Sequence, residues 1–213
     1  MKNLKGLFIL FLILATATAV LVYLIPYLQK KNINIEDRKS GLEQVSKNYG
    51  TSIDSCAAIF EISPEYLKAL CMLECGGRKE FAQRLEPHVY NKLKMVKFGT
   101  LENYEHVTKE MLADANDDAL KNLASSWGPF QLMGYKCLLL NIKAKDIRGD
   151  NAVYYGTKWI DMTYGKYLKK EKYKDAFHIH NTGMPHPTIG GPRTYDAEYC
   201  ARGLKYMAYF KEH

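Results

Sequence analysis

One glutamate lies where a carboxylate is energetically unfavourable. The segment 63–77 predicts a short helix, because Ser63 is a favoured N-cap, Pro64 fits the first helical position and two glycines follow its end. Glu74 falls at helical spacing on the apolar face of this helix. That face comprises Leu67, Leu70 and Cys71. Burial against apolar neighbours disfavours the charged carboxylate, so Glu74 is suited to act as a general acid. The alternative is an ordinary glutamate at the border of a buried stripe.

Two later segments combine polar, aromatic and glycine residues. Residues 124–135 read Ala-Ser-Ser-Trp-Gly-Pro-Phe-Gln-Leu-Met-Gly-Tyr, and residues 176–183 read Ala-Phe-His-Ile-His-Asn-Thr-Gly. Gln131 offers both donors and acceptors to sugar hydroxyl or acetamido groups. Trp127 and Tyr135 provide flat faces for a pyranose ring, although core packing is the alternative for Trp127.

The order of these segments resembles the lysozyme-like superfamily, which includes goose-type lysozymes and lytic transglycosylases. Within it, the similarity is closest to the N-acetylmuramidase domains of bacterial and phage cell-wall enzymes. Members carry a catalytic glutamate at a helix end, a Gly-x-x-Gln-x-Met-like segment and a Tyr-Asn-x-Gly-like segment. These are matched here by Glu74, 128–133 and 181–183. The resemblance covers roughly residues 50–210, and the stretch 126–134 is its most specific part.

The resemblance implies a peptidoglycan glycosidase that cleaves between N-acetylmuramic acid and N-acetylglucosamine, with Glu74 as the general acid. The residues expected to bind or orient sugar are Trp127, Gln131, Tyr135, His180 and Asn181. His180 stands where family members usually have tyrosine. A histidine can still donate a hydrogen bond, but it titrates near neutral pH. An inactive lysozyme-like module that binds glycan or serves as a scaffold is therefore an alternative.

A second carboxylate separates two types of enzyme. A hydrolase needs a base or nucleophile besides its acid, whereas a lytic transglycosylase can use the muramyl 6-hydroxyl and a single carboxyl group. Glu86 follows Glu74 by 12 residues. Muramidase-like relatives have an acid in this region, so Glu86 is the candidate for a catalytic or substrate-orienting role. Three other acids are expected to lie on a solvated helix face, namely Asp114, Asp117 and Asp118.

Metal and cysteine chemistry are weaker alternatives. A four-ligand zinc set could be formed by Cys71, Cys75, His178 and His180. However, histidines two residues apart do not share a helix face, and no cysteine begins a helix where its thiolate would be favoured. We therefore expect no metal, no cofactor and no Cys–His peptidase. One or two disulfides among the five cysteines are plausible in an exported domain, although Cys71 and Cys75 are poorly placed to bond each other.

The elements that position these residues are mostly helical. Helices are predicted at 40–48, 52–60, 63–75, 87–98, 109–123, 130–140, 151–168, 172–180 and 195–210, with a loop at 181–192. No alternating pattern lasts long enough to require a sheet, although a small hairpin could form around 78–86 or 123–127. The sequence therefore predicts an all-α, lysozyme-like domain with room for one small β-hairpin.

The N-terminus has the pattern of a membrane segment. Residues 6–29 carry no charge, and as a helix they would reach ~36 Å, enough to cross roughly 30 Å of hydrocarbon. Small residues at 15–19 resemble signal-peptidase sites, but the apolar run continues beyond them, so an uncleaved signal anchor is favoured over a cleaved signal peptide. The expected organisation is an anchor or signal peptide at 1–31, a tether at 32–39 and an enzyme domain at 40–213, outside the cytoplasm.

The net charge is modest once the N-terminal segment is set aside. The chain carries +7, and the four lysines of residues 1–31, which include no acid, leave +3 for the remainder. This mild positive charge suits an anionic polymer such as a cell wall and does not argue for nucleic acid. The expected partners are peptidoglycan glycan strands and the membrane, and the sequence sets no oligomeric state.

Overall fold

The computed structural model describes residues 25–79 and 83–213, with side chains described from residue 38 onward. The chain divides into two compact units, Met1–Gly41 and Leu42–His213. In the first unit the described backbone is helical, as the beginning of α2 (Ile25–Phe60).

The predicted anchor at residues 6–29 lies almost entirely outside the described residues. Among the helices that the structure describes, none has both the length and the apolar character that crossing a bilayer needs. Residues 32–39, expected to form a polar tether, are helical and belong to α2.

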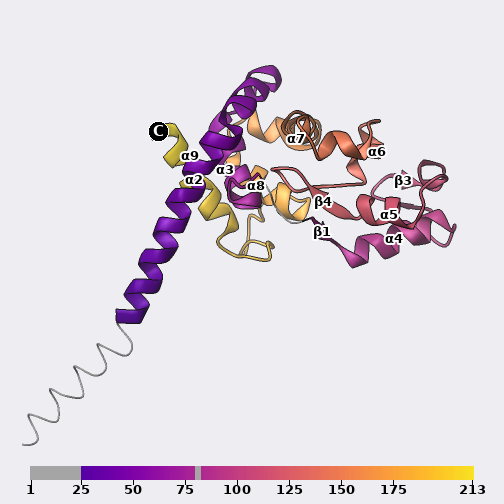
Figure 1. Ribbon diagram of the computed structural model, residues 1–213, viewed down its shortest axis with the longest axis horizontal. Coiled ribbons are helices and arrows are strands. Elements are labelled where there is room, and N and C mark those ends of the chain that lie inside the picture. The colour runs from indigo at the N-terminus through magenta and orange to yellow at the C-terminus, as the bar shows by residue number, and fades with distance from the viewer. Residues whose placement is uncertain (1–24, 80–82) are drawn as a thin grey trace, which may run out of the picture. The chain divides into compact units, whose positions relative to one another are not determined.

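Within the unit Leu42–His213, several helices surround one apolar core, and we call them the helical half (Figure 1). They are α2 from Leu42 onward, α3 (Pro64–Cys75), α7 (Ala152–Leu168), α8 (Tyr173–Thr182) and α9 (Tyr199–Glu212). α3 packs along α9, and α8 packs against both α7 and α9. The mostly helical character of the chain agrees with the predicted fold class.

The caps of α3 are those that the sequence predicts. The Ser63 side chain accepts a hydrogen bond from the Tyr66 backbone N–H at 3.1 Å, and Pro64 begins the helix. Gly76 ends it in the left-handed conformation, at φ 62°. The predicted apolar face is confirmed, because Leu67, Leu70 and Cys71 are all fully buried.

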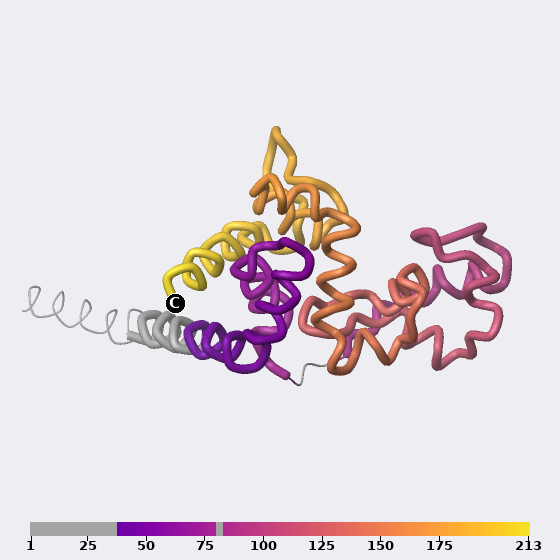
Figure 2. Tube along the Cα trace, turned by 90° about the horizontal axis from the view of Figure 1, so that it is seen from above, coloured from indigo at the N-terminus to yellow at the C-terminus, as the bar shows by residue number. Residues whose placement is uncertain are grey.

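The remaining elements form a second apolar cluster, which we call the mixed half. Its helices are α4 (Pro87–Lys97), η2 (Glu110–Leu112), α5 (Asp117–Leu123), α6 (Lys136–Leu139) and η3 (Ala144–Ile147). β2 (Asn103–Tyr104) and β3 (Val107–Thr108) form a small hairpin. Figure 2 shows α4 and this hairpin at one end of the unit and α8 with α9 at the other.

A three-stranded antiparallel sheet completes the mixed half, in the order β1 (Arg84–Leu85), β4 (Ser125–Trp127), β5 (Leu132–Met133). The sequence suggested a small hairpin around either 78–86 or 123–127. Among the described residues neither region forms a hairpin by itself; each supplies one strand, and the two strands pair with each other, Arg84 opposite Ser126. This pairing joins segments about 40 residues apart, which local periodicity cannot reveal.

Four predicted helices differ from those observed, namely 40–48, 52–60, 109–123 and 130–140. Gly50 does not break α2, because a glycine in a helix costs only ~1 kcal/mol and buried neighbours such as Ile53 hold the helix together. The predicted helix 109–123 is two short ones, since Asn116 caps the backbone N–H of Ala119 and starts α5 afresh. The predicted helix 130–140 is wrong as well, because its first residues form a turn and β5.

The C-terminal helices follow the prediction with shifted ends. α7 lies where the helix 151–168 was expected. α8 continues to Thr182, so Asn181 lies in its last turn, not in the predicted loop. α9 begins at Tyr199, four residues later than predicted, since the chain from Gly183 to Glu198 has no regular structure apart from turns and bends.

Candidate active site

Glu74 lies in the last turn of α3, and its side chain is 17% exposed. The hydroxyl of Tyr199, the first residue of α9, donates a hydrogen bond to Glu74 Oε1. Because α3 and α9 pack along each other, this bond fixes the carboxyl group between two rigid elements. Glu74 therefore has a defined orientation and keeps partial access to solvent, as an acid that reaches a substrate requires.

His180 is the second polar neighbour of Glu74, with Nε2 at 3.9 Å from Glu74 Oε1. The same Nε2 lies 3.1 Å from the backbone oxygen of Phe130, and Nδ1 lies 2.7 Å from the Tyr164 hydroxyl. A carbonyl oxygen only accepts, so Nε2 carries the hydrogen and Nδ1 accepts from Tyr164. Burial lowers the pKa of His180, although Glu74 and the Phe130 carbonyl act in the opposite direction. The ring is thus neutral at pH 7.

Two buried tyrosines extend this network into the core. Tyr66 of α3 donates to the Tyr164 hydroxyl at 3.4 Å, and the Tyr164 hydroxyl in turn donates to His180 Nδ1. Burial raises the pKa of both tyrosines, so both remain protonated donors. Tyr164 has non-helical backbone angles, φ −140° and ψ 17°, and marks a kink in α7. We call Glu74 with Tyr66, Tyr164, His180 and Tyr199 the Glu74 cluster.

The turn between β4 and β5 lies against the Glu74 cluster through the bond from His180 to Phe130. Gly128 and Gln131 both have positive φ, 72° and 49°. A Cβ at Gly128 would lie 3.0 Å from the Ile147 backbone oxygen, so glycine is needed there for close packing as well as for backbone angle. The result is a tight reversal that presents Phe130 O to α8.

The side chain of Gln131 holds this turn together. Its Oε1 accepts from the Ser126 hydroxyl at 2.8 Å, and its Nε2 donates to the Gly128 carbonyl at 3.1 Å. One amide hydrogen and one acceptor site remain for a ligand, since an amide offers two of each. Contact between Gln131 and a sugar stays a prediction, and the structure adds a positioning role.

The predicted aromatic platforms are differently placed. Trp127 Nε1 donates to the Asn122 carbonyl at 2.8 Å, and the Arg148 guanidinium lies 4.7 Å from the indole centroid. Tyr135 is only 4% exposed and packs its ring against Tyr104 in the mixed half. Trp127 is partly exposed, whereas Tyr135 is a core residue in this structure.

Glu86 is not joined to the Glu74 cluster by any hydrogen bond or ion pair within residues 25–79 and 83–213. It precedes α4, and its carboxylate pairs with Arg84 Nε at 2.9 Å and lies 3.8 Å from His88 Nδ1. Its side chain is 24% exposed, so solvent and substrate can reach it. The three acids expected on a solvated helix face are exposed; Asp117 and Asp118 lie in α5, whereas Asp114 lies in the turn after η2.

Two further residues of α8 lie on either side of His180 in the sequence, namely His178 and Asn181. Asn181 is exposed, and its side chain has no polar partner in the part of the chain that the structure describes. His178 is fully buried; its Nδ1 lies 2.7 Å from the Met184 oxygen and its Nε2 accepts from the Arg193 backbone N–H. Both nitrogens of His178 are therefore engaged in holding the following loop, which leaves neither for a metal.

The cysteines form no disulfide. All five are free and buried, contrary to the disulfides considered plausible from the sequence. Cys71 Sγ and Cys75 Sγ lie 3.6 Å apart beside Glu74. Among the described residues, no group of three or more histidines, cysteines and acids could hold a metal ion.

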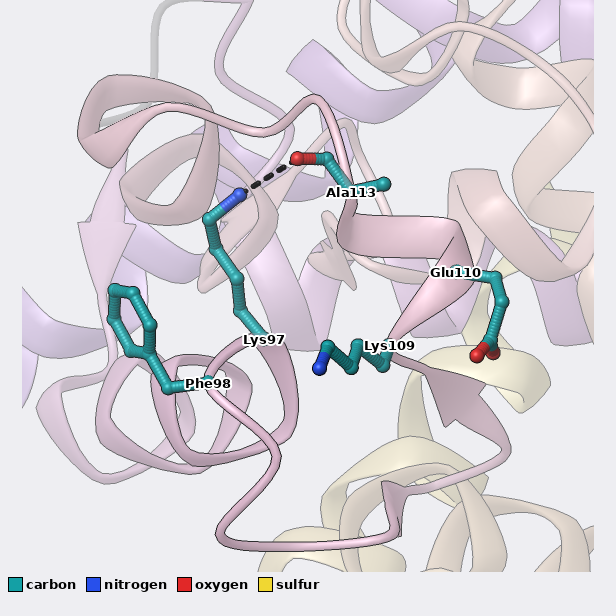
Figure 3. Close-up of a pocket in the computed structure, with 5 residues that line it drawn as sticks. All are labelled: Lys97, Phe98, Lys109, Glu110 and Ala113. Carbon is teal, nitrogen blue, oxygen red and sulfur yellow. Dashed lines mark hydrogen bonds between the residues drawn. The ribbon is translucent and has the colours of Figure 1, made fainter.

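A cavity of about 480 Å³ lies elsewhere, between α4 and η2 (Figure 3). Its lining consists of Lys97, Phe98, Lys109, Glu110 and Ala113. Lys97 Nζ donates to the backbone oxygens of Leu112 and Ala113, so this ammonium group is used to end η2. The cavity contains none of the residues predicted to act in chemistry.

Comparisons of the chain with protein-family models, with curated proteins and with solved structures found no match. The Glu74 cluster therefore has to be interpreted from its own geometry. Sequence reasoning found Glu74 and His180, but it missed Tyr199, Tyr164 and Tyr66. Nothing in local periodicity distinguishes these among the 16 tyrosines of the chain.

Proposed function

We propose that the chain is a peptidoglycan glycosidase, an N-acetylmuramidase, with Glu74 as its general acid. The observation that carries this proposal is the half-buried carboxyl of Glu74, oriented by the Tyr199 hydroxyl and adjoined by the neutral ring of His180. Cleavage of a glycosidic bond needs a carboxylic acid that donates its proton to the leaving oxygen. Glu74 Oε1 is occupied by Tyr199, which leaves Oε2 to carry that proton.

The surrounding residues support this role by their positions. His180 links Glu74 to the turn that carries Gln131, so the acid and a predicted sugar ligand belong to one connected arrangement. Asn181, in the next position of α8, exposes an amide that is free to bind a sugar. The site residues of the proposal are therefore Glu74 as acid and Gln131, His180 and Asn181 as the residues that orient sugar, with Trp127 at the edge.

The second carboxylate divides the proposal into two reactions. In a hydrolase, Glu86 would act as base or orient water. In a lytic transglycosylase, the muramyl 6-hydroxyl would attack and one carboxyl group would suffice. The transglycosylase is supported by the polar contacts of Glu74, which are both with neutral groups, Tyr199 and His180. A reducing end in the product indicates hydrolysis, and a 1,6-anhydro end indicates the transglycosylase.

Clearing of purified sacculi by the full-length protein in detergent tests the proposal. Glu74→Gln should lower the rate by roughly 10²–10⁴-fold, which is the usual contribution of a general acid. Glu43→Gln is the matched control, because Glu43 is an exposed glutamate of α2 and should retain full activity. If the wild-type protein binds sacculi without cleaving them, the glycan-binding or scaffold alternative holds and the enzyme proposal fails.

The proposed substrate lies outside the cytoplasmic membrane, so the proposal also requires export of residues 40–213. The uncharged segment 6–29 is the proposed signal anchor, and a cleaved signal peptide is the second possibility. The N-terminal sequence of the protein recovered from cells distinguishes them. An anchor retains Met1 in the membrane fraction, whereas cleavage gives a new N-terminus near residues 17–20.

A further inference from the structure

A second cavity, of about 400 Å³, lies against the turn between β4 and β5. Its lining comes from α2, from Lys79 after α3, from Gly128 and Pro129 of the turn, and from the segment that begins at Arg148 and enters α7. Gly128 and Pro129 line this cavity, while the next residue, Phe130, bonds to His180. One turn therefore belongs both to the cavity and to the surroundings of Glu74.

One wall of the cavity is fixed by side-chain hydrogen bonds. Asn48 Nδ2 donates to the Gly77 carbonyl and the Tyr49 hydroxyl donates to the Arg78 carbonyl, each at 2.8 Å. Burial raises the pKa of Tyr49, so its hydroxyl stays protonated and able to donate. These two bonds hold the backbone that leads into Lys79 against α2, and the lysine is presented to the cavity by an anchored segment.

Arg148 is a second cation in the lining of this cavity. The Arg148 guanidinium lies over the Trp127 indole, with 4.7 Å between the guanidinium carbon and the ring centroid. This contact restrains the guanidinium group and uses none of its N–H groups in a hydrogen bond to the ring, so they remain donors for a ligand. Within residues 25–79 and 83–213, neither Arg148 nor Lys79 has a side-chain hydrogen bond or an ion pair.

The one negative charge in the lining does not offset the positive charges of Lys79 and Arg148. Asp150 is the one acid in the lining, and it precedes the N-terminus of α7, where a carboxylate is electrostatically favoured. α7 itself has no side-chain N-cap, and its first residues, Ala152 and Val153, line the cavity. The lining therefore holds two cations and one acid, and the excess positive charge favours an anion.

We propose that this cavity binds a carboxylate of the peptide stem that N-acetylmuramic acid carries, as a stem subsite beside the glycan site. The inference rests on the proposed function, and it assigns the peptide stem of the substrate to the cavity beside the turn between β4 and β5. Arg148 offers the planar, bidentate donor set that matches a carboxylate, and Lys79 adds a point charge. About 400 Å³ is enough for a few residues of stem but not for a folded partner.

Binding, measured without turnover, tests the stem subsite. The full-length Glu74→Gln protein in detergent is titrated by calorimetry with two glycan fragments of equal length, one bearing stems and one from which an amidase has removed them. We expect the stem-bearing fragment to bind about tenfold more tightly, as one charge-assisted bidentate contact provides. Adding Lys79→Ala and Arg148→Ala should remove this difference.

A matched pair of charge deletions controls for net charge. Lys205→Ala with Lys211→Ala removes two exposed cations of α9 and should leave the tenfold preference intact. Equal affinity for both fragments, no binding of either, or a preference that survives the Lys79 and Arg148 substitutions would each overturn the subsite. Inorganic phosphate that binds through Lys79 and Arg148, with no preference for stems, would assign the cavity to a phosphate and also overturn it.

The proposed function and the subsite can fail separately. If the wild-type protein cleaves no glycan but Glu74→Gln still prefers stem-bearing fragments, the enzymatic proposal fails and the subsite stands. If the wild-type protein cleaves glycan and its KM is the same for stem-bearing and stripped strands, the subsite fails and the enzymatic proposal stands.

Discussion

Glu74 and Glu86 are two glutamates of similar exposure, 17% and 24%, in very different surroundings. Glu74 belongs to the helical half and contacts a tyrosine hydroxyl and a neutral imidazole. Glu86 belongs to the mixed half and contacts an arginine and a histidine. Exposure alone therefore does not distinguish the proposed general acid from Glu86, whereas the chemical kind of the partner does.

The difference in partners has a chemical consequence. A tyrosine hydroxyl can donate to Glu74 Oε1 whether or not a proton resides on Oε2, so this partner supports both states of an acid that gives up and regains a proton. A guanidinium group favours the charged carboxylate over the neutral carboxylic acid. Glu86 with Arg84 is suited to orient water or substrate as an anion, and only Glu74 has partners that fit a complete cycle of proton transfer.

The substitution with the largest expected effect on stability disrupts the mixed half and leaves the partners of Glu74 unchanged. In Gly134→Ala, the new Cβ would lie 2.1 Å from the Asn122 backbone oxygen, and backbone cannot move aside as a flexible side chain can. We expect a loss of at least ~2 kcal/mol in the free energy of unfolding, measured by urea denaturation.

Gly50→Ala is the control for that substitution. Gly50 lies inside α2, and a Cβ there would meet no atom within 4 Å, so the change should stabilise the protein by ~0.5–1 kcal/mol. Equal effects of the two substitutions would mean that the packing of the turn after β5 is not as tight as described.

The next substitution tests whether the orientation of the Glu74 carboxyl matters for cleavage without disturbing the packing of the helical half. Tyr199→Phe removes the hydroxyl that contacts Glu74 Oε1 and keeps the ring in the core. We expect cleavage to slow by roughly 10–100-fold, which corresponds to the loss of a hydrogen bond to an ionisable group. Tyr195→Phe, at a fully exposed tyrosine, should have no effect on cleavage. Unchanged activity of Tyr199→Phe would remove Tyr199 from the site.

The neutral state of His180 predicts a pH dependence of stability. Burial places the pKa of His180 below 6.5, its ordinary value in the unfolded chain. Below pH 6.5 the unfolded chain binds the extra proton first, so acidification should destabilise the fold by at most about 1.4 kcal/mol per pH unit from this residue. His180→Gln should flatten the dependence between pH 6.5 and 5, measured by thermal unfolding at several pH values. A steeper dependence in the variant would contradict the neutral ring.

The smallest effect concerns Glu86. Arg84→Ala removes its ion-pair partner, whose side chain is 77% exposed, and an exposed pair contributes only about 0–1 kcal/mol. We expect stability to change by less than ~1 kcal/mol, measured alongside Lys92→Ala as an exposed control. A loss above ~2 kcal/mol would show that the mixed half depends on this pair.

The sequence was sufficient for the elements whose signals are local. Ser63, Pro64 and the glycines after α3 predict that helix at both ends, and with it the position of Glu74. The sequence was insufficient where contacts between distant segments determine the conformation. Gln131 adopts a positive φ that a glutamine rarely takes, and only the bonds to Ser126 and Gly128 explain it.

The partners of Glu74 could not be predicted for the same reason. Tyr199 lies 125 residues from Glu74 along the chain, and its contact depends on how α9 packs on α3. The pairing of β1 with β4 likewise depends on contacts between distant segments. Short motifs thus predicted the candidate acid, and only the packed structure showed which side chains orient it.

The central claim is that Glu74 donates a proton to the leaving oxygen, and a change of leaving group tests it most directly. The rate of Glu74→Gln is measured on natural glycan and on a glycan fragment with a nitrophenyl leaving group, which departs without protonation. The account predicts a loss of roughly 10²–10⁴-fold on natural glycan and of less than about tenfold on the nitrophenyl substrate. Equal losses on both substrates would contradict it.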